Sequence, residues 1–478
     1  GNDIDNEIFA NALDNVIAGG GGDDILHGGA GSDVLELSGS AADYVIDYRN
    51  RSLSDGVITD ANLADGDDGV DTFYSFETVR FGDGVELTVT SEDSEIFRVN
   101  EYTSSYQYYP SVTTLTDGSF VVTWQDSSGH SGGSGTDIRG QLYNPIGEAV
   151  GGEFLVNSVV SSTQEYSDVQ ALADGGFVVA WRDNSGTDGG SSWDVRAQRF
   201  DAKATAIGDE FRVNTHTGNE QREPSIASLD DGGFVVTWMD SSGHDGGSSW
   251  DIRMQRYTSG VDENGEVTTV AVGDEMMVNT YTSGPQEVPS IGSLADGGFV
   301  VTWRDNSSHS NNWDVWAQQF DANSDAVGGE FRVNSYESSE QREARVTGLE
   351  GGGYVITWHD NSSHSGGSGW DVRAQIYDNN GIAVGSEFRV NEYTSSSQYY
   401  PDVAPLEGGG FIITWWDDSS HDGGSSYDVY AQRYDADGSV NGNEFQVNTY
   451  TTSDQENPST TALNDGGFVI TWMSYNQD

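Results

Sequence analysis

The chain has no cysteine and few basic residues, and both shortages restrict its chemistry and its partners. Without cysteine, neither disulfide bonds nor thiol chemistry is available. Only 20 lysines and arginines stand against 78 aspartates and glutamates, which gives a net charge of −58. This charge disfavours nucleic acids and anionic membrane surfaces as partners. Cations are the natural complement, and the acidity suits saline surroundings.

Long apolar runs are also missing. No stretch is long enough to cross a bilayer, so we expect no membrane insertion. No signal peptide is visible either, but the sequence opens on Gly1 inside a repeat and without an initiator methionine. Its start therefore carries no information on targeting.

The chain does contain a long internal repeat. Seven times it carries an E-F-R-V-N-like segment, a Gln, a P-S-V-like segment, D-G-G-F-V-V-T-W, a Gly/Ser loop and D-V-R-A-Q-R-Y, the last absent from the seventh copy. The Trp of the central segment recurs at Trp124, Trp181, Trp238, Trp303, Trp358, Trp415 and Trp472. The resulting spacings of 57, 57, 65, 55, 57 and 57 residues indicate a repeat fold.

Each repeat offers four short runs rich in Val, Ile, Phe, Tyr and Trp without helical periodicity, which predicts antiparallel strands. The run at 177–181 is almost entirely apolar, as in a strand covered on both faces. The pattern predicts an all-β fold in which residues 94–478 form a seven-bladed β-propeller of four-stranded blades, the last one incomplete. A solenoid is the alternative. We expect a strand at 95–100 to complete the last sheet and latch the ring.

A different pattern precedes the propeller. The motif G-G-x-G-x-D-x-U-x occurs in tandem as GGGGDDILH at 19–27 and GGAGSDVLE at 28–36, and its register extends back through Asn15 and Asn6. We expect one coil turn for every nine residues. Over residues 1–37 the chain resembles the RTX family of secreted calcium-binding proteins. The resemblance implies a parallel β-roll that binds Ca²⁺, export of the unfolded chain by type I secretion, and an extracellular or cell-surface location.

Calcium takes roughly six to eight oxygen ligands, and glycine-rich turns expose carbonyl oxygens beside carboxylates. The candidate metal ligands are Asp24, Asp33, Asn15, Gly19, Gly21, Gly28 and Ala30. Asn6 and Asn15 stand where the later motifs have Asp, which lowers the ligand charge in the earlier turns. A disordered Gly/Asp linker is the alternative, but a linker needs no nine-residue register of Ile and Leu.

Residues 38–93 are expected to form a β-rich capping and connecting segment. Within it, the run at 69–84 is similar to a segment often found beside RTX repeats. We expect this run to be a hairpin that covers the open end of the roll, because unpaired strand edges invite association.

In five repeats the propeller loop ends on an aromatic residue, and in three of these an arginine follows three residues later. An aromatic face with a guanidinium group can hold a sugar ring, and repetition around a ring would make a multivalent lectin. The candidate ligand-binding residues are Trp193, Arg196, Trp250, Arg253, Trp313, Trp370, Arg373 and Tyr427. Packing between adjacent blades is the competing interpretation of the same spacing.

Other repeated residues favour structural roles. Aspartates bracket each loop, as Asp183 and Asp194 do, and predict either additional Ca²⁺ sites or carboxylates that accept N–H groups in turns. Histidines six residues after most of the Trp residues lie on separate repeats, too far apart to converge on zinc. Unbroken series of Gln from Gln107 and of Asn from Asn100 predict amides that hydrogen-bond to their own blade and to the next.

Three functions follow from these patterns. The first is an extracellular, calcium-binding adhesion module that recognises a polysaccharide or cell-surface glycan. The second is a structural unit of a surface layer or filament that assembles with copies of itself through Ca²⁺. The third is a polysaccharide lyase, with His216 and His359 as its lone candidate histidines because they fall outside the shared loop register. Near-identical repeats favour binding over a single catalytic centre.

Overall fold

The computed structural model describes residues 6–10, 15–27, 33–38, 44–47, 56–60, 70–74, 76, 78–82, 85–88, 96–130, 135–190, 192–247, 249–261, 267–307, 312–364, 369–418, 427–464 and 466–475. The chain forms two compact units, residues 1–97 with 465–467, and residues 98–464 with 468–478. Almost all regular structure is β. In the described part of the chain, no helix has the length and hydropathy needed to span a membrane.

The N-terminal unit contains parallel strands that alternate between two sheets. Its strands are β1 (Glu7–Phe9), β2 (Val16–Ile17), β3 (Ile25–His27), β4 (Val34–Glu36), β5 (Tyr44–Asp47), β6 (Gly56–Asp60), β7 (Val70–Tyr74), β8 (Thr78–Arg80) and β9 (Glu86–Thr88). β1 pairs with β3 and β2 with β4, with Glu7 opposite Ile25 and Val16 opposite Val34. Partners are thus 18 residues apart. The expectation of one coil turn for every nine residues is therefore wrong, because consecutive motifs enter different sheets.

The run at 69–84 extends both sheets of the roll. β7 pairs in parallel with β3 and β8 in parallel with β4, whereas a hairpin alone had been expected there. β8 and β9 do form an antiparallel hairpin, and β5, β6 and β7 are antiparallel neighbours. Leu26, Leu35 and Phe73 are fully buried in the core of this unit.

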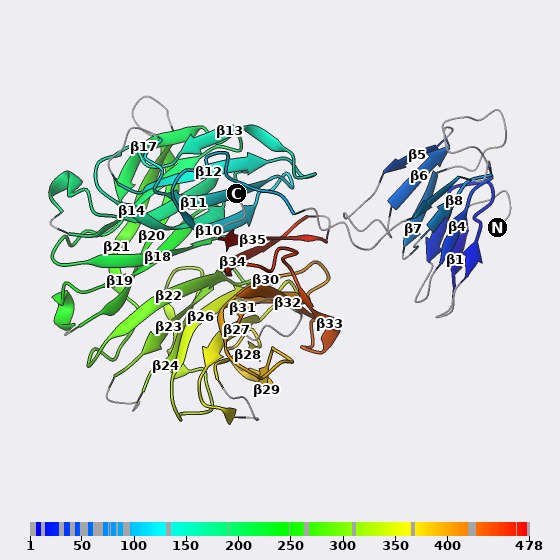
Figure 1. The fold of residues 1–478 in the computed structure, drawn as a ribbon. Coiled ribbons are helices and arrows are strands. Elements are labelled where there is room, and N and C mark those ends of the chain that lie inside the picture. Colours follow the sequence, from blue (N-terminus) through cyan, green and yellow to red (C-terminus); the bar gives the residue numbers. More distant parts are fainter. Residues whose placement is uncertain are drawn as a thin grey trace. The chain divides into compact units, whose positions relative to one another are not determined.

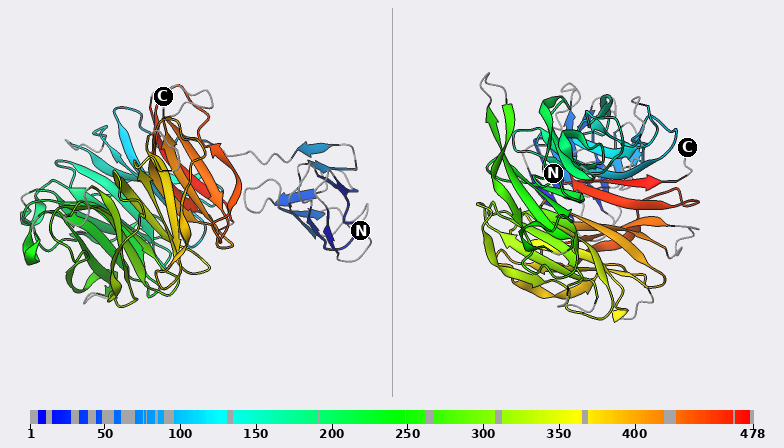
Figure 2. Two further views of the ribbon diagram at one scale, coloured as in Figure 1. Left: turned by 90° about the horizontal axis from the view of Figure 1, so that it is seen from below. Right: turned by 90° about the vertical axis from the view of Figure 1, so that its left-hand side faces the viewer.

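The second unit is a propeller whose sheets follow one another around a common centre (Figures 1 and 2). The innermost strands are β10 (Gln107–Thr114), β14 (Gln164–Ala171), β18 (Gln221–Ser228), β22 (Gln286–Ser293), β26 (Gln341–Gly348), β30 (Gln398–Pro405) and β34 (Gln455–Ala462). The second strands are β11 (Phe120–Asp126), β15 (Phe177–Asp183), β19 (Phe234–Asp240), β23 (Phe299–Asp305), β27 (Tyr354–Asp360), β31 (Phe411–Asp417) and β35 (Phe468–Ser474).

The outer half of each sheet is formed by the third and fourth strands. The third strands are β12 (Asp137–Tyr143), β16 (Asp194–Phe200), β20 (Asp251–Val261), β24 (Asp314–Phe320), β28 (Asp371–Tyr377) and β32 (Asp428–Tyr434). The fourth strands are β13 (Ala149–Leu155), β17 (Ala206–Arg212), β21 (Val267–Met277), β25 (Ala326–Arg332), β29 (Ala383–Arg389) and β33 (Val440–Gln446). Two short 3-10 helices, η3 (Thr187–Gly189) and η4 (His244–Gly246), lie in loops.

The prediction of seven four-stranded blades is wrong. In the described residues the propeller has six four-stranded blades, which we number 1 (β10–β13) to 6 (β30–β33), and the seventh repeat forms only the two-stranded sheet β34–β35. In the first six repeats the segment that corresponds to D-V-R-A-Q-R-Y forms the third strand, and the seventh repeat does not contain this segment. The strand expected at 95–100 to complete the last sheet is not observed: residues 96–100 lie outside any strand, and residue 95 lies outside the described residues.

The inner strands nevertheless form a closed circle, because β34 contacts both β30 and β10. Side chains four residues after the repeated Gln join neighbouring inner strands in several repeats. Asp168 Oδ2 accepts a hydrogen bond from the Ile226 N–H (2.7 Å), and Ser459 Oγ accepts one from the Val112 N–H (3.3 Å). The second of these bonds connects the last inner strand with the first.

The second strands carry the propeller core. In blades 1, 3, 5 and 6 every residue of this strand is buried, so both faces pack on neighbouring sheets as the apolar pattern predicts. Trp181 is fully buried in a cluster that also contains Leu115 and Ile138 of the preceding blade. The fourth strands lie at the outer edge and are largely exposed.

Candidate functional site

The repeated amides connect one blade to the next. Asn214 Nδ2 donates to Asp194 Oδ1 in blade 2 (2.7 Å) and to Gln221 Oε1 in blade 3 (3.3 Å). Gln221 Nε2 in turn donates to Asp240 Oδ1 (2.9 Å). The same sequence of bonds recurs at Asn157, Asn279, Asn334 and Asn391. The structural interpretation of the Asn and Gln series is confirmed.

The aspartates that bracket the loops are acceptors in the same network. Asp183 and Asp194 lie opposite each other in the ladder of β15 and β16. Asp183 accepts hydrogen bonds from Gln164 Nε2 (2.8 Å) and from the Ser185 N–H (3.1 Å), whereas Asp194 accepts one from Asn214. Burial raises the pKa of Asp194 despite that bond. These contacts favour the turn interpretation of the Asp pairs over additional Ca²⁺ sites.

The arginines of the predicted sugar-binding pairs are buried in ion pairs. Arg373 Nε is 2.7 Å from Asp360 Oδ2, and its Nη1 is 3.1 Å from Glu387 Oε1. The side chains of Arg196, Arg253 and Arg373 are 4 %, 1 % and 2 % exposed. Each of these arginines therefore lies inside its own blade, in contact with carboxylates.

Other arginines accompany the tryptophans. At the end of the blades where the inner strands begin, rings and guanidinium groups alternate in two series of contacts, one from Tyr166 to Trp250 and one from Arg304 to Trp370, which together we call the aromatic–arginine belt. The belt consists of Tyr166, Arg182, Trp193, Arg222, Trp250, Arg304, Trp313, Arg342 and Trp370. Arg182 lies 4.1 Å from the Tyr166 ring centre and 4.7 Å from that of Trp193. The four tryptophans are half-exposed, as is Tyr427, which contacts Trp416 (4.5 Å between ring centres).

Carboxylates complete the belt in two matching places. Arg182 forms ion pairs with Glu165 (2.6 Å) of its own blade and Glu223 (2.7 Å) of the next. Two blades further on, Arg304 does the same with Glu287 (2.7 Å) and Glu343 (2.6 Å). Burial raises the pKa of Glu223 to about 7, because desolvation and the negative charge of Glu343 outweigh the attraction of Arg182. The belt therefore holds a half-buried carboxyl that binds protons near neutral pH.

A backbone feature positions these side chains. The residue two places after each repeated Gln has a positive φ between 47° and 55° although none is glycine: Tyr109, Tyr166, Glu223, Val288, Glu343, Tyr400 and Asn457. The ladder shifts register there, which marks a β-bulge in every inner strand. Bulges of this kind redirect side chains, and here they direct Glu223 and Glu343 to arginines of the preceding blade.

The histidines of the propeller differ in their surroundings. His130 and His364 stack on Tyr102 and Tyr336, with ring centres 3.5 and 3.4 Å apart, whereas His309 and His421 lie outside the described residues. His359 is buried among Trp370, Tyr399 and Tyr400, and its Nδ1 accepts the N–H of Tyr400 (3.2 Å).

Burial and nearby arginines lower the pKa of His359 to about 3, so the ring is neutral. His359 is thus enclosed by aromatic side chains. His216, the other lone candidate, is part of a separate cluster described below.

In the N-terminal roll, Asp24 and Asp33 are buried and precede strands of different sheets. Each accepts the backbone N–H of the Asn 18 residues earlier: Asn6 (2.6 Å) for Asp24 and Asn15 (2.8 Å) for Asp33. The two carboxylates therefore do not stack on each other.

The glycine turn before β3 lies close to Asp24. A side chain at Gly19 would collide with the Asp24 carboxylate, and Gly20 and Gly22 adopt positive φ values of 98° and 103°. Gly21 belongs to the same turn, whereas Gly28 and Ala30 lie outside the described residues.

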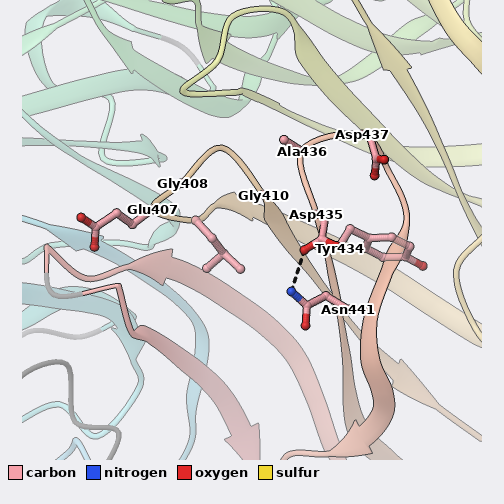
Figure 3. Close-up of a pocket in the computed structure, with 9 residues that line it drawn as sticks. Glu407, Gly408, Gly410, Tyr434, Asp435, Ala436, Asp437 and Asn441 are labelled. Atoms are coloured by element: carbon pink, nitrogen blue, oxygen red, sulfur yellow. Dashed lines mark hydrogen bonds between the residues drawn. The ribbon is translucent and has the colours of Figure 1, made fainter. Parts of the chain in front are cut away.

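A shallow hollow occurs at the opposite end of blade 6 from the belt. It lies between the turn after β30 and the turn after β32, with Glu407, Asp435 and Asp437 along its edge (Figure 3). Asn441 Nδ2 donates to Asp435 Oδ1 (2.7 Å), and Ser439 holds the pKa of Asp437 below its usual value through hydrogen bonds. Tyr434 is the single aromatic side chain in its lining.

No family model and no curated protein matches this chain, so the resemblance to RTX proteins stays a prediction. Solved structures are similar at low identity. An α-L-arabinofuranosidase from Fusarium graminearum is 12 % identical with a TM-score of 0.46, over 69 % of this chain and 93 % of that one. The NanB sialidase of Streptococcus pneumoniae is 9 % identical with a TM-score of 0.43, over 90 % of this chain and 80 % of that one. A PL25 ulvan lyase is 10 % identical with a TM-score of 0.44, over 75 % of this chain and 92 % of that one.

The belt residues that sequence reasoning missed carry a signal of their own. At positions that hold the fold together the seven repeats are nearly constant, but at the residue after each Trp they diverge: Gln125, Arg182, Met239, Arg304, His359, Trp416 and Met473. Positions one and two after each Gln diverge in the same way. Because the fold is the same in every repeat, residues that vary at equivalent positions are those that the fold does not require.

Proposed function

We propose that the propeller binds carbohydrate at the aromatic–arginine belt. Half-exposed tryptophan faces suit the apolar side of a sugar ring, and guanidinium and carboxylate groups suit its hydroxyls. The observation that carries the proposal is a pair of ring and guanidinium clusters at positions where the repeats diverge on their inner and second strands. Tyr166 and Arg182 meet Trp193 in one cluster, and Arg304 meets Trp313 in the other. Two matching clusters would also allow one long chain to be held at two points.

The charge of the belt favours a neutral glycan. Arg182 and Arg304 are each paired with two glutamates, so the positive charge is already compensated. The whole chain carries −58 and repels polyanions over a Debye length of about 10 Å at moderate salt. We therefore propose a neutral polysaccharide or cell-surface glycan as the ligand, with acidic polysaccharides as the contrast.

We further propose that the N-terminal roll binds Ca²⁺ and that the protein works outside the cell. Two observations support the calcium assignment. Asp24 and Asp33 are buried carboxylates, and the glycine turn before β3 lies close to Asp24, which brings together the carboxylate and carbonyl oxygens that calcium takes as ligands. Asp24 and the carbonyls of Gly19 and Gly21 are the residues that would hold one ion, and Asp33 with Asn15 another. A calcium-dependent surface adhesion module accounts for both units.

The test is binding of the full chain to a panel of neutral and acidic polysaccharides, followed by calorimetry on those that bind. Trp313→Ala should weaken binding about tenfold, the effect of losing one stacked ring. Trp316→Ala is the matched control, because this half-buried tryptophan lies on β24, contacts Tyr281 (5.9 Å) and takes part in none of the ring–guanidinium contacts that define the belt. Equal losses in both variants would contradict the assignment.

The same panel separates the alternatives. Steady release of reducing ends or unsaturated products would show that the protein degrades polysaccharide, and Glu223 would then be the first residue to substitute. Binding to none of the polysaccharides, together with calcium-driven assembly in solution, would favour a structural role over glycan binding.

A further inference from the structure

We propose that His216, His244 and Glu275 form a zinc site in blade 3. Nδ1 or Nε2 of each histidine and a carboxylate oxygen of Glu275 lie within 4.8 Å of one another. Glu275 Oε1 is 3.4 Å from His244 Nε2 and 3.5 Å from His216 Nδ1. In a tetrahedral site with bonds of about 2.0–2.1 Å, neighbouring ligand atoms are about 3.3 Å apart. The distances from Glu275 Oε1 to the two histidine nitrogens are therefore close to those between ligand atoms of a tetrahedral zinc site.

Glu275 is a second, independent indication of a ligand. Its side chain is only 3 % exposed, and in the described residues its Oε1 accepts no hydrogen bond. The nearest guanidinium nitrogen, Nη1 of Arg253, is 3.7 Å away. In blade 5 the equivalent Arg373 Nη1 donates to Glu387 Oε1 at 3.1 Å. A buried carboxylate oxygen without a hydrogen-bond donor, facing two imidazoles, suits a cation.

The third repeat alone brings two histidines together. In the other repeats the position of His216 holds Tyr102, Val159, Tyr281, Tyr336, Tyr393 and Tyr450. The ring stack itself is shared, because His216 lies 3.3 Å from His244 between ring centres and Tyr336 lies 3.4 Å from His364. Packing is thus equally well served by tyrosine, and histidine adds a metal-binding nitrogen.

Hydrogen bonds around His244 favour the tautomer that could bind a metal ion through Nε2. Ser242 Oγ donates to Asp240 Oδ2 (2.7 Å) and can then accept the Nδ1–H of His244, which leaves the lone pair on Nε2.

His216 completes the site from the solvent side. Its side chain is 47 % exposed, so the ring can tilt out of the stack toward an ion and away from Thr215 Oγ1, 3.2 Å from its Nδ1. Exposure also leaves the fourth position open to water. The carboxylates of Asp240 and Glu275 and the guanidinium of Arg253 together carry a charge of about −1 beside the site, which favours a doubly charged cation.

The test uses the full chain with excess Ca²⁺, so that sites for hard cations are filled. Zn²⁺ titrated against a chromophoric chelator should reveal one tight site, and Co²⁺ should give the visible bands of a tetrahedral complex. His216→Tyr, which introduces the residue of five other repeats, should weaken Zn²⁺ binding at least about 100-fold and abolish the cobalt bands. Circular dichroism should show an unchanged fold.

Two further variants complete the design. Glu275→Gln keeps the size of the side chain and should also abolish the cobalt bands. His364→Gln removes a histidine from the same loop position in blade 5 and should leave Zn²⁺ binding unchanged. Failure of the wild-type chain to bind Zn²⁺ more tightly than micromolar, or equal binding by His216→Tyr, would overturn the proposal.

Discussion

Asp402 occupies an inner-strand position whose residue type differs between the repeats. At this position four repeats have serine, whose hydroxyl can accept an N–H from the next strand, as Ser459 does. Asp402 accepts the Thr460 N–H in the same way (2.7 Å) but brings a charge. Burial raises its pKa from 3.8 to about 6, although Arg345 opposes the shift. The negative charge is therefore a cost to the folded state at neutral pH.

We expect Asp402→Asn to change the pH dependence of stability. Because the folded pKa is raised, the protonated carboxyl favours folding below about pH 4, and this contribution is lost as the pH rises through about 6. Relative to the wild type, the variant should gain of the order of 1–3 kcal/mol between pH 4.5 and pH 7.5 in urea unfolding.

Asp321→Asn is the control of opposite sign. The carboxylate of Asp321 accepts the N–H groups of Asn323 and Asp325, which lower its pKa. Its contribution is present above about pH 4 and is lost as the pH falls further. Parallel pH profiles for the two variants would contradict the assignment to Asp402.

At the scale of elements, the bulge in each inner strand matters most. It places one residue of every repeat in the left-handed region, which costs about 1–2 kcal/mol for a residue with a Cβ. The same bulges bring Glu223 and Glu343 to Arg182 and Arg304. Strain of this kind at ligand-facing positions is typical of functional sites.

Val288→Asn should stabilise the propeller by about 1 kcal/mol. Val288 is β-branched at φ 53°, where asparagine is better tolerated, and Asn457 occupies the equivalent position of the seventh repeat. The measurement is the urea midpoint of the propeller. Val327→Asn, on the exposed outer strand β25 and outside the left-handed region, should be neutral or slightly destabilising. Equal effects of the two substitutions would show that backbone strain is not the cause.

At the scale of the molecule, the two units are built in different ways. The propeller closes through contacts between strands far apart in sequence, including β10 with β34, and its core is made of large apolar side chains. The N-terminal unit has short strands and buries Asp24 and Asp33. A charge of −58 distributed over the whole chain makes both units sensitive to cations.

We expect Ca²⁺ to raise the unfolding temperature of the N-terminal unit by several degrees, since a ligand at about 100 times its Kd adds about 2.7 kcal/mol. Calorimetry of the full chain should show this shift in one transition, beyond the effect of Mg²⁺ at equal ionic strength. The double variant Asp24→Asn with Asp33→Asn should lose the difference between the two cations. A calcium response that survives in this variant would contradict the assignment.

The sequence by itself determined the local order of the molecule. The nine-residue register predicted parallel strands, and the apolar runs ending in Trp181 and its equivalents predicted second strands buried on both faces. The Asn and Gln series predicted bonds between blades, as Asn214 and Gln221 show. These features follow from backbone periodicity and from the need of buried amides for partners, both of which act over short distances.

Only the tertiary structure decided what the repeats bring together. The number of complete blades depends on whether a third strand is available for pairing, and the identity of the arginine beside each Trp depends on which strands become neighbours. Arg196 is 3 residues from Trp193 yet is buried within its blade, whereas Arg182 reaches the ring from the adjacent strand. Contacts across strands and between blades are set by the closure of the ring, which spacing along one repeat does not contain.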